Sequence, residues 1–320
     1  MNINWELLNE FENSIDTIHP EKGKVPINIL GYGEISIVFE IVNDEQQIAY
    51  KRLPIFDTEL QVNRHIKAYK LYHQILLGLG LTVPPFDAGW IRHQKGPIVL
   101  YCAQEKVPVE TVGHKIIHHS ISKDKINTLV LLLMREMYKI WAFNNRSKSL
   151  KVGLDGQISN WVVKDYDPHN PNITEESQLI YLDTSTPIFR KHGIEGMEPV
   201  LFLKSAPFFL RWLLKALFLK EVMDRYYDWR LVTIDLIANF FKEQRPELIP
   251  DLIEVVNNFF TQEVKDLNIE PLTYNEVKKY YDEDKQIWVI FQTARRLDRY
   301  IQTKLFRKQY NFYLPGKIER

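Results

Sequence analysis

The hydrophobic pattern of the chain changes character near Pro108, and this change constrains the fold more than any other feature. Between residues 25 and 103, β-branched and aromatic residues alternate with polar ones over runs typical of strands. One helical stretch interrupts these runs, beginning at residues 57–59 and ending at Gly78 and Gly80. After Pro108 the pattern becomes helical. The sequence therefore predicts an α+β protein, in which a small sheet with one helix precedes a larger helical region.

The helical region contains a stretch that is too apolar for a surface position. Residues 122–143 are predicted to form a helix, and their segment 128–134 is almost continuously apolar. We expect this helix at the centre of a second core. Short strand-like segments follow at residues 160–164 and 178–182, and from about residue 199 the pattern is helical nearly to the end. A crossover near residues 104–108 predicts a cleft between the two regions.

The composition is that of an ordinary globular protein. The 320 residues include 41 basic and 41 acidic side chains, which argues against a dedicated nucleic-acid coat. The single cysteine, Cys102, lies in an apolar run, so we expect a buried structural thiol and a reducing compartment. The first residues lack a basic start followed by an apolar stretch, and we therefore expect a cytoplasmic protein.

The most apolar segment is residues 207–220. It is too short to span a membrane, and it carries Arg211, Lys215 and Lys220 at helical spacing. We expect a helix of the core, with a helix on a membrane surface as the alternative. No membrane is expected among the partners.

Two features of the strand-like region could contact a phosphate group. Gly31 and Gly33 lie between strand-like runs, where glycine lets a turn approach a ligand closely. Lys51 follows the apolar segment 48–50, and a strand in that setting could direct its ammonium group to phosphate oxygens. Glu59, at the head of the following helix, could hold Lys51 by an ion pair. An ordinary hairpin turn and a surface lysine are the alternatives when each feature is taken alone.

Three residues of the second region could form a catalytic and metal-binding centre. Asp155 precedes Asn160 by five residues on a loop that leads into a strand, so a carboxylate could face a substrate hydroxyl and an amide oxygen a metal ion. Asp183 ends the apolar segment 180–182 and could complete a site for a divalent cation. The Asp-to-Asn interval recurs twice within residues 165–172, and a helix or turn cap is the alternative for Asp183.

The order of these features limits the folds that fit them. With its features in this order, the chain resembles the protein-kinase-like superfamily. It is most similar to the aminoglycoside-phosphotransferase-like branch. The resemblance implies phosphate contacts by Gly31, Gly33 and Lys51, a helix acid at Glu59, adenine contacts by the backbone of Glu105 and Val107, a catalytic base at Asp155, and magnesium ligands at Asn160 and Asp183.

The resemblance also implies a bilobal protein-kinase-like fold. Residues 1–103 would form an N-lobe with a small antiparallel sheet and one helix, residues 104–108 the hinge, and residues 109–320 a larger, mostly helical C-lobe. The implied activity is an ATP- and Mg²⁺-dependent transfer of the γ-phosphoryl group to a hydroxyl. The expected partners are ATP and a small hydroxyl-bearing acceptor, with no nucleic acid.

The chain departs from the family pattern at several positions. Ser36 stands in place of the third glycine, Gly153 and Leu154 stand where His-Arg or His-Gly is usual, and Thr184 and Ser185 replace Phe-Gly. These departures keep two alternatives open. One is a protein kinase or a nucleotidyl-transferring relative. The other is a catalytically weak pseudokinase that acts as a binding or scaffold module.

Overall fold

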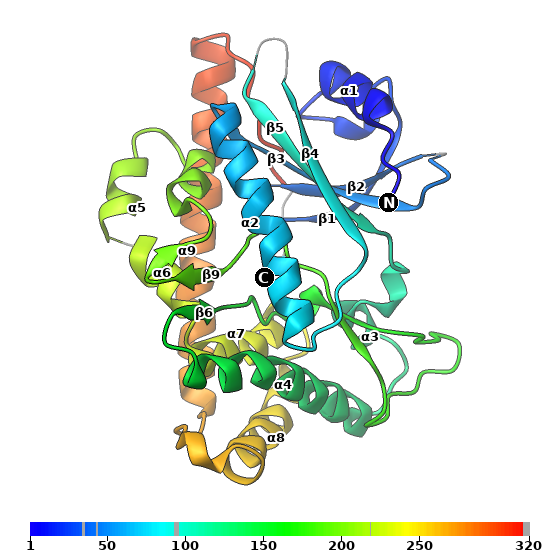
Figure 1. The fold of residues 1–320 in the computed structure, drawn as a ribbon, viewed down its shortest axis with the longest axis vertical. Coiled ribbons are helices and arrows are strands. Elements are labelled where there is room, and N and C mark those ends of the chain that lie inside the picture. The colour runs from blue at the N-terminus through cyan, green and yellow to red at the C-terminus, as the bar shows by residue number, and fades with distance from the viewer. Residues whose placement is uncertain (34–35, 43, 93–95, 218, 316–320) are drawn as a thin grey trace.

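A five-stranded antiparallel sheet dominates the first third of the chain in the computed structural model, which describes residues 1–33, 36–42, 44–92, 96–217 and 219–315 (Figure 1). Its strand order is β1-β2-β3-β5-β4, and every neighbouring pair is antiparallel. The strands are β1 (Ile27–Tyr32), β2 (Ile37–Ile41), β3 (Ile48–Phe56), β4 (Phe86–Arg92) and β5 (Ile98–Glu105). The predicted order of a small sheet before a helical region is confirmed.

One helix, α2 (Glu59–Gly78), connects β3 to β4 and packs on the sheet. It begins with a capping box, in which Thr58 and Gln61 each satisfy a backbone N–H of the other. Its end is set by Gly80, whose φ of +82° lies in the left-handed region that glycine adopts without strain. Apolar side chains of its inner face pack against β3 and β5, where Cys102 is buried as predicted.

The rest of the chain is mainly helical, and Figure 1 shows α4, α7 and α8 gathered at the end of the molecule away from α1. The helices are α1 (Trp5–Ser14), α3 (Gly113–Ile116), α4 (Lys123–Arg146), α5 (Arg211–Leu217), α6 (Leu219–Arg225), α7 (Trp229–Lys242), α8 (Ile249–Gln262) and α9 (Tyr274–Tyr300). Helix α4 confirms the predicted buried helix, because its apolar face lies in the largest core with α7 and α8. Among the described residues, no helix has the length and apolarity needed to cross a membrane.

The segment that connects α4 to α5 in the sequence forms two small sheets. Strands β6 (Leu150–Val152), β9 (Phe189–Lys191) and β10 (Ile194–Glu195) form one, with β9 in the middle. Strands β7 (Trp161–Val163) and β8 (Leu179–Tyr181) form the other, as an antiparallel pair. The two strand-like segments predicted at residues 160–164 and 178–182 are therefore confirmed. Their pairing places residue 160 beside residue 182, where the Leu182 N–H donates to the Asn160 carbonyl at 2.8 Å.

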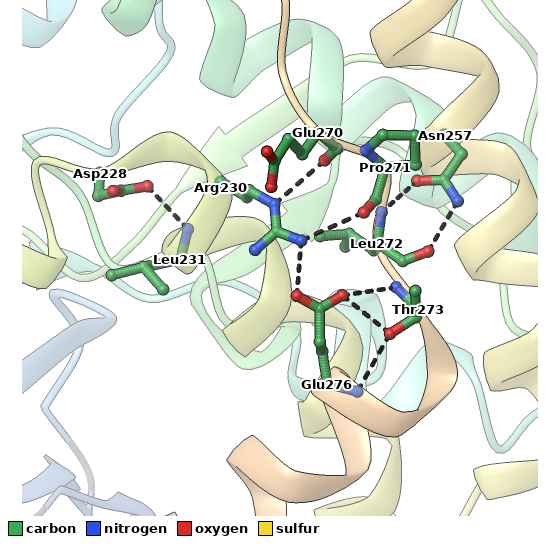
Figure 2. A network of polar contacts seen from close by, with 9 residues as sticks. All are labelled: Asp228, Arg230, Leu231, Asn257, Glu270, Pro271, Leu272, Thr273 and Glu276. Carbon is green, nitrogen blue, oxygen red and sulfur yellow. Dashed lines mark hydrogen bonds and ion pairs between the residues drawn. The ribbon is translucent and has the colours of Figure 1, made fainter.

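Polar contacts fix the junction of α7, α8 and α9 (Figure 2). Arg230 on α7 donates to the carbonyls of residues 270 and 271 and to Glu276 on α9, the last at 2.8 Å. Asn257 on α8 bonds both backbone groups of Leu272. These contacts hold the start of α9 against α7. They thereby fix the position of Tyr280 on α9 relative to Asp235 on α7, to which it donates a hydrogen bond.

The apolar segment 207–220 differs from the prediction of a single core helix. It forms a turn and the short helices α5 and α6, and the Trp212 side chain is 70% exposed. The physical reason lies in its spacing: Phe208, Arg211, Trp212 and Lys215 recur at intervals of three and four, so aromatic and cationic side chains share one face. Burial of that face would strip Lys215 of water without supplying a partner among the described residues, although Arg211 bonds the carbonyls of residues 204 and 206.

A buried ion pair links α1, the sheet and the C-terminal segment. Arg52 on β3 donates two hydrogen bonds of 2.7 Å to the carboxylate of Glu12, which is completely buried. Tyr101 on β5 donates to the same carboxylate, and Arg52 also donates to the carbonyl of Asn311 at 2.9 Å. Since each donor and acceptor of the pair has a partner, the charges are tolerated in the core.

Glu12→Gln tests how much the sheet depends on this pair. The substitution leaves the buried Arg52 guanidinium without a counter-charge, and we expect the free energy of unfolding to fall by about 3 to 5 kcal/mol. Urea denaturation followed by circular dichroism measures it. Glu59→Gln is the matched control, because it breaks the exposed pair with Arg92 and should change stability much less. Equal losses in both variants would contradict the assigned role of the pair.

Candidate active site

Lys51 and Asp183 are in direct contact, although 132 positions separate them in the sequence. The Lys51 ammonium on β3 lies 2.8 Å from Asp183 Oδ1, just beyond the end of β8. Ser185 donates a second hydrogen bond to the same oxygen at 3.1 Å. Burial by itself would raise the pKa of Asp183, but the charge of Lys51 and these hydrogen bonds outweigh it and hold that pKa below its usual value. Asp183 is therefore ionised and paired.

A neutral hydrogen-bond network positions the segment that carries Asp183. Gln104 on β5 donates to the Leu182 carbonyl at 3.0 Å and to the Thr184 hydroxyl at 2.9 Å. Burial lowers the pKa of His73 to about 4, so its ring is neutral at neutral pH. Because His73 Nδ1 must donate to the Tyr69 carbonyl, its Nε2 accepts from the Thr184 hydroxyl at 2.9 Å. His73 on α2 and Gln104 on β5 thus fix the segment through uncharged groups.

Asp155 lies in the loop after β6 with its carboxyl group only partly accessible. Its Oδ1 accepts the backbone N–H of Gln157 at 3.1 Å. Burial, together with the nearby charges of Asp235 and Asp183, raises the pKa of Asp155 to about 7. The carboxyl group can therefore exchange a proton near neutral pH, as an acid-base group of an active site requires.

Asn160 connects the Asp155 loop to the Asp183 segment. Its side-chain amide donates to the Asp155 carbonyl at 3.2 Å, and its own carbonyl accepts the Leu182 N–H. The structure thus brings Lys51, Asp155, Asn160 and Asp183 into one region. In the parts of the chain described, no group of three or more His, Cys, Asp or Glu residues could hold a metal ion. Any ion here would need ligands beyond these side chains.

Gly33 lies beside Lys51. A Cβ atom added to Gly33 would come within 2.6 Å of the Ser36 hydroxyl, which is too close, and would make an ordinary contact of 3.9 Å with Lys51 Cε. The Ser36 hydroxyl is buried and has no hydrogen-bond partner among the described residues. At Gly31, by contrast, an added Cβ would meet no atom within 4 Å. Residues 34 and 35, which complete the predicted glycine-rich turn, lie outside the described residues.

The predicted ion pair between Lys51 and Glu59 is wrong. Glu59 pairs with Arg92 at 2.9 Å instead, and its side chain is 55% exposed. The physical reason is the position of Glu59 as the first residue of α2. Its exposed side chain reaches Arg92 at the end of β4 and does not face Lys51. The inner face of α2 presents His65 near Asp183, where its Nε2 donates to the Ser185 carbonyl at 3.0 Å.

Glu105 ends β5, and Val107 follows it in the connecting segment, so both lie at the end of an inner strand of the sheet. The Glu105 N–H donates to the Pro85 carbonyl at 2.9 Å, and the Lys106 N–H donates to the Gln47 carbonyl at 2.8 Å. Within the described ranges, the Val107 N–H has no such partner. The N–H groups of Glu105 and Lys106, by contrast, are used by the fold.

Sequence reasoning did not single out Asp235, which lies on the buried helix α7. Its carboxylate accepts the side-chain amide of Gln157 at 3.2 Å and the hydroxyl of Tyr280 at 3.0 Å. Arg225 in turn donates to the Tyr280 hydroxyl at 2.7 Å. Gln157 therefore bridges Asp155 and Asp235. One signal was available, because an aspartate within an apolar helical run is expected only where a polar partner meets it.

Comparison with known proteins assigns the chain to a family. The family described as "Family of unknown function (DUF6206)" matches residues 10–299, and the chain belongs to it. No curated protein matches the sequence. Among solved structures, the GDP complex of wild-type aminoglycoside 2'-phosphotransferase-IIIa is similar over 76% of this chain and 93% of that chain, at 11% identity and a TM-score of 0.33. That score is too low to assign a shared fold, so function has to be inferred from the chain's own residues.

Asp155→Asn tests the raised pKa of this carboxyl group by its effect on stability. A carboxyl group whose pKa is higher in the folded than in the unfolded state destabilises the fold as pH rises from about 4 to about 7. The amide carries no such penalty. We expect the variant to unfold at a higher temperature than the parent protein at about pH 8, with the difference shrinking toward about pH 4.

Differential scanning calorimetry at the two pH values measures this effect. Asp167→Asn, an exposed aspartate in the loop before β8, is the matched control and should show the same offset at both. An offset for Asp155→Asn that does not depend on pH would contradict the assignment.

Proposed function

We propose that the chain is a bilobal, kinase-like phosphotransferase that moves the γ-phosphoryl group of ATP to a hydroxyl of a small molecule. In this proposal residues 1–103 form the N-lobe, residues 104–108 the hinge and residues 109–320 the C-lobe. The sheet order β1-β2-β3-β5-β4, with a single helix between β3 and β4, supports the N-lobe assignment. The largest hydrophobic core is built mainly on α4, α7 and α8 and also takes in Tyr72 and Leu76 of α2, which supports a mainly helical C-lobe packed against α2.

The observation that carries the proposal is the contact between Lys51 and Asp183 beside Asp155. An ammonium group on the central strand of a sheet can bind phosphate oxygens, and an ionised carboxylate next to it can bind a cation that accompanies them. The charge of Asp183 is one of the causes that raise the pKa of Asp155 to about 7, so the two carboxyl groups interact. These are the parts that phosphoryl transfer needs: a positive charge for phosphates, an oxygen ligand for a metal and an acid-base group.

The surroundings of Lys51 fit a nucleotide. Gly33 places no side chain between the Ser36 hydroxyl and Lys51, and the buried Ser36 hydroxyl has no protein partner among the described residues. In the proposal the phosphates lie against this turn and Lys51. The N–H of Val107 and the carbonyl of Glu105 would contact the adenine.

The oxygen atoms of Asn160 and Asp183 fit a magnesium ion. Magnesium commonly binds to proteins through one or two side-chain oxygens and takes its other ligands from phosphates and water. When bound, the ion would neutralise charge that develops on the transferred phosphoryl group. Asn160 would supply its amide oxygen, since its amide nitrogen already donates to the Asp155 carbonyl.

In the proposal Asp155 orients the acceptor hydroxyl and takes its proton. Its pKa near 7 suits a base at neutral pH, because the group is partly ionised and still binds the proton well enough to remove it. Gln157 holds one carboxylate oxygen through its backbone N–H and reaches Asp235 through its side chain. Asp235 is therefore assigned a positioning role.

Asp155→Asn should abolish turnover while leaving nucleotide binding intact. Removal of a general base typically lowers the rate by about a hundredfold or more. With the acceptor unidentified, consumption of ATP in the presence of magnesium is the assay, and Asp167→Asn is the matched control. Unchanged ATP consumption in Asp155→Asn would overturn the role of Asp155. Mass spectrometry of the product distinguishes transfer of phosphate from transfer of AMP, the reaction of a nucleotidyl-transferring relative.

Lys51→Met should remove the stabilisation that ATP and magnesium give to the protein. A ligand at about a hundred times its dissociation constant adds ~2.7 kcal/mol to the stability of a protein that binds it only when folded. Thermal denaturation with and without ATP and magnesium measures the effect. Lys70→Met on α2 is the control, because that exposed lysine pairs with Asp87 and should leave the shift unchanged. A full shift in Lys51→Met would place the nucleotide elsewhere.

A nucleotide-binding module with little or no catalysis is the second candidate. It is favoured by one observation: after Glu59, helix α2 has no acidic residue, so Lys51 takes Asp183 itself as its partner. This candidate predicts a thermal shift with ATP in the parent protein, but no ATP consumption that depends on Asp155. The phosphotransferase predicts both.

A further inference from the structure

The surface formed by the turn before α5 and by α5 and α6 exposes several large aromatic side chains. Phe208 is 57% exposed, Phe209 38% and Trp212 70%. The rings of Phe208 and Phe209 contact each other edge to face, with centroids 5.4 Å apart. Leaving three such rings in water is costly, so this surface is suited to contact something other than bulk water.

Four cations accompany the aromatic residues in the sequence. Between Glu198 and Glu221 the sequence contains Lys204, Arg211, Lys215 and Lys220 and no acidic residue. The fold uses two of them: Lys204 pairs with Asp57, and Arg211 donates to the carbonyls of Lys204 and Ala206.

The other two cations, Lys215 and Lys220, are exposed. Neither has an ion-pair partner among the residues that the structure describes. Their charges are therefore available to an anionic partner. On α6 the exposed Glu221 follows Lys220 directly in the sequence, so Lys215 is the cation farther from an acidic residue. We call the exposed residues Phe208, Phe209, Trp212, Lys215 and Lys220 the aromatic-basic surface.

We propose that the aromatic-basic surface binds the protein peripherally to membranes that contain anionic lipid. Trp and Phe side chains favour the boundary between lipid headgroups and acyl chains, where their rings leave water. Lysine side chains beside them attract the negative surface of an anionic leaflet. Helices α5 and α6 are short, and they would lie in the plane of the membrane surface. The inference is independent of phosphotransfer.

A second copy of the chain fits the surface less well. A two-fold dimer through this face would bring the same patch of each copy together. Both copies would then bring the positive charges of Lys215 and Lys220 into one interface without acidic partners from this surface, and like charges repel when they are desolvated. An anionic lipid surface supplies the opposite charge along with an apolar layer.

Co-sedimentation of the full chain with vesicles tests the proposal. One set of vesicles is pure phosphatidylcholine, and the other contains about a third phosphatidylserine. We expect binding to the anionic vesicles only, weakened by added salt because screening acts on the lysine charges. Equal binding to both sets, or binding to neither, would overturn the proposal.

Two variants of the surface locate the contact. Trp212→Ser removes the most exposed ring, and we expect at least a tenfold loss of vesicle binding. The double variant Lys215→Glu and Lys220→Glu should cost more, since each basic residue near an anionic surface contributes on the order of fivefold. Both variants change exposed side chains, so their thermal unfolding midpoints should match that of the parent chain.

Matched controls lie on α2. Leu60→Ser changes an apolar side chain that is 81% exposed, and Lys67→Glu reverses an exposed charge outside the aromatic-basic surface. Neither should alter vesicle binding. Losses in the controls equal to those of the surface variants would overturn the proposal. So would a dimer in sedimentation velocity that Trp212→Ser dissociates while vesicle binding is unchanged, because that result would assign the surface to a second copy.

Discussion

Two neighbouring cations on β3, Lys51 and Arg52, form ion pairs on opposite faces of the sheet. Side chains alternate along a strand, so Lys51 and Arg52 point to opposite faces of the sheet. Arg52 lies on the face covered by α1, where it pairs with Glu12 in the core. Lys51 lies on the face covered by α2, where it pairs with Asp183, which is 132 positions away in the sequence. A shift of β3 by one residue would exchange the two cations and break both pairs at once.

The neutral network around residues 182–185 follows from that constraint. A second charged partner near Asp183 would compete with Lys51 for it, or repel it. Instead Gln104 and Thr184 hold the segment, together with His65 and His73, whose pKa values burial lowers to about 4. The segment is therefore fixed by groups that carry no charge at neutral pH. Lys51 is left as the cation that directly contacts Asp183.

Sequence patterns predicted what depends on local spacing and missed what depends on distant neighbours. The start of α2 could be predicted because residues 57–59 carry a local N-cap signal, and Thr58 is indeed the N-cap. The partner of Glu59 could not, since Arg92 reaches it only after the sheet has formed. Asp235 was missed for the same reason, and Trp212 was misplaced because its apolar neighbours outweighed the cations that share its face. The structure brings Lys51 and Asp183 together, but their roles in catalysis stay predictions.

The carboxylates of the proposed active site outnumber the cations near them. Asp155, Asp183 and Asp235 lie close enough for their charges to interact, while Lys51 and Arg225 are the cations that act on them. This imbalance is one reason why Asp155 retains a proton up to about pH 7. If a divalent cation binds at Asn160 and Asp183 as proposed, it offsets the repulsion and the pKa of Asp155 falls. Metal binding would then increase the ionised fraction of Asp155 at neutral pH and weaken it as a base, so the same charge imbalance would couple the protonation of Asp155 to metal binding.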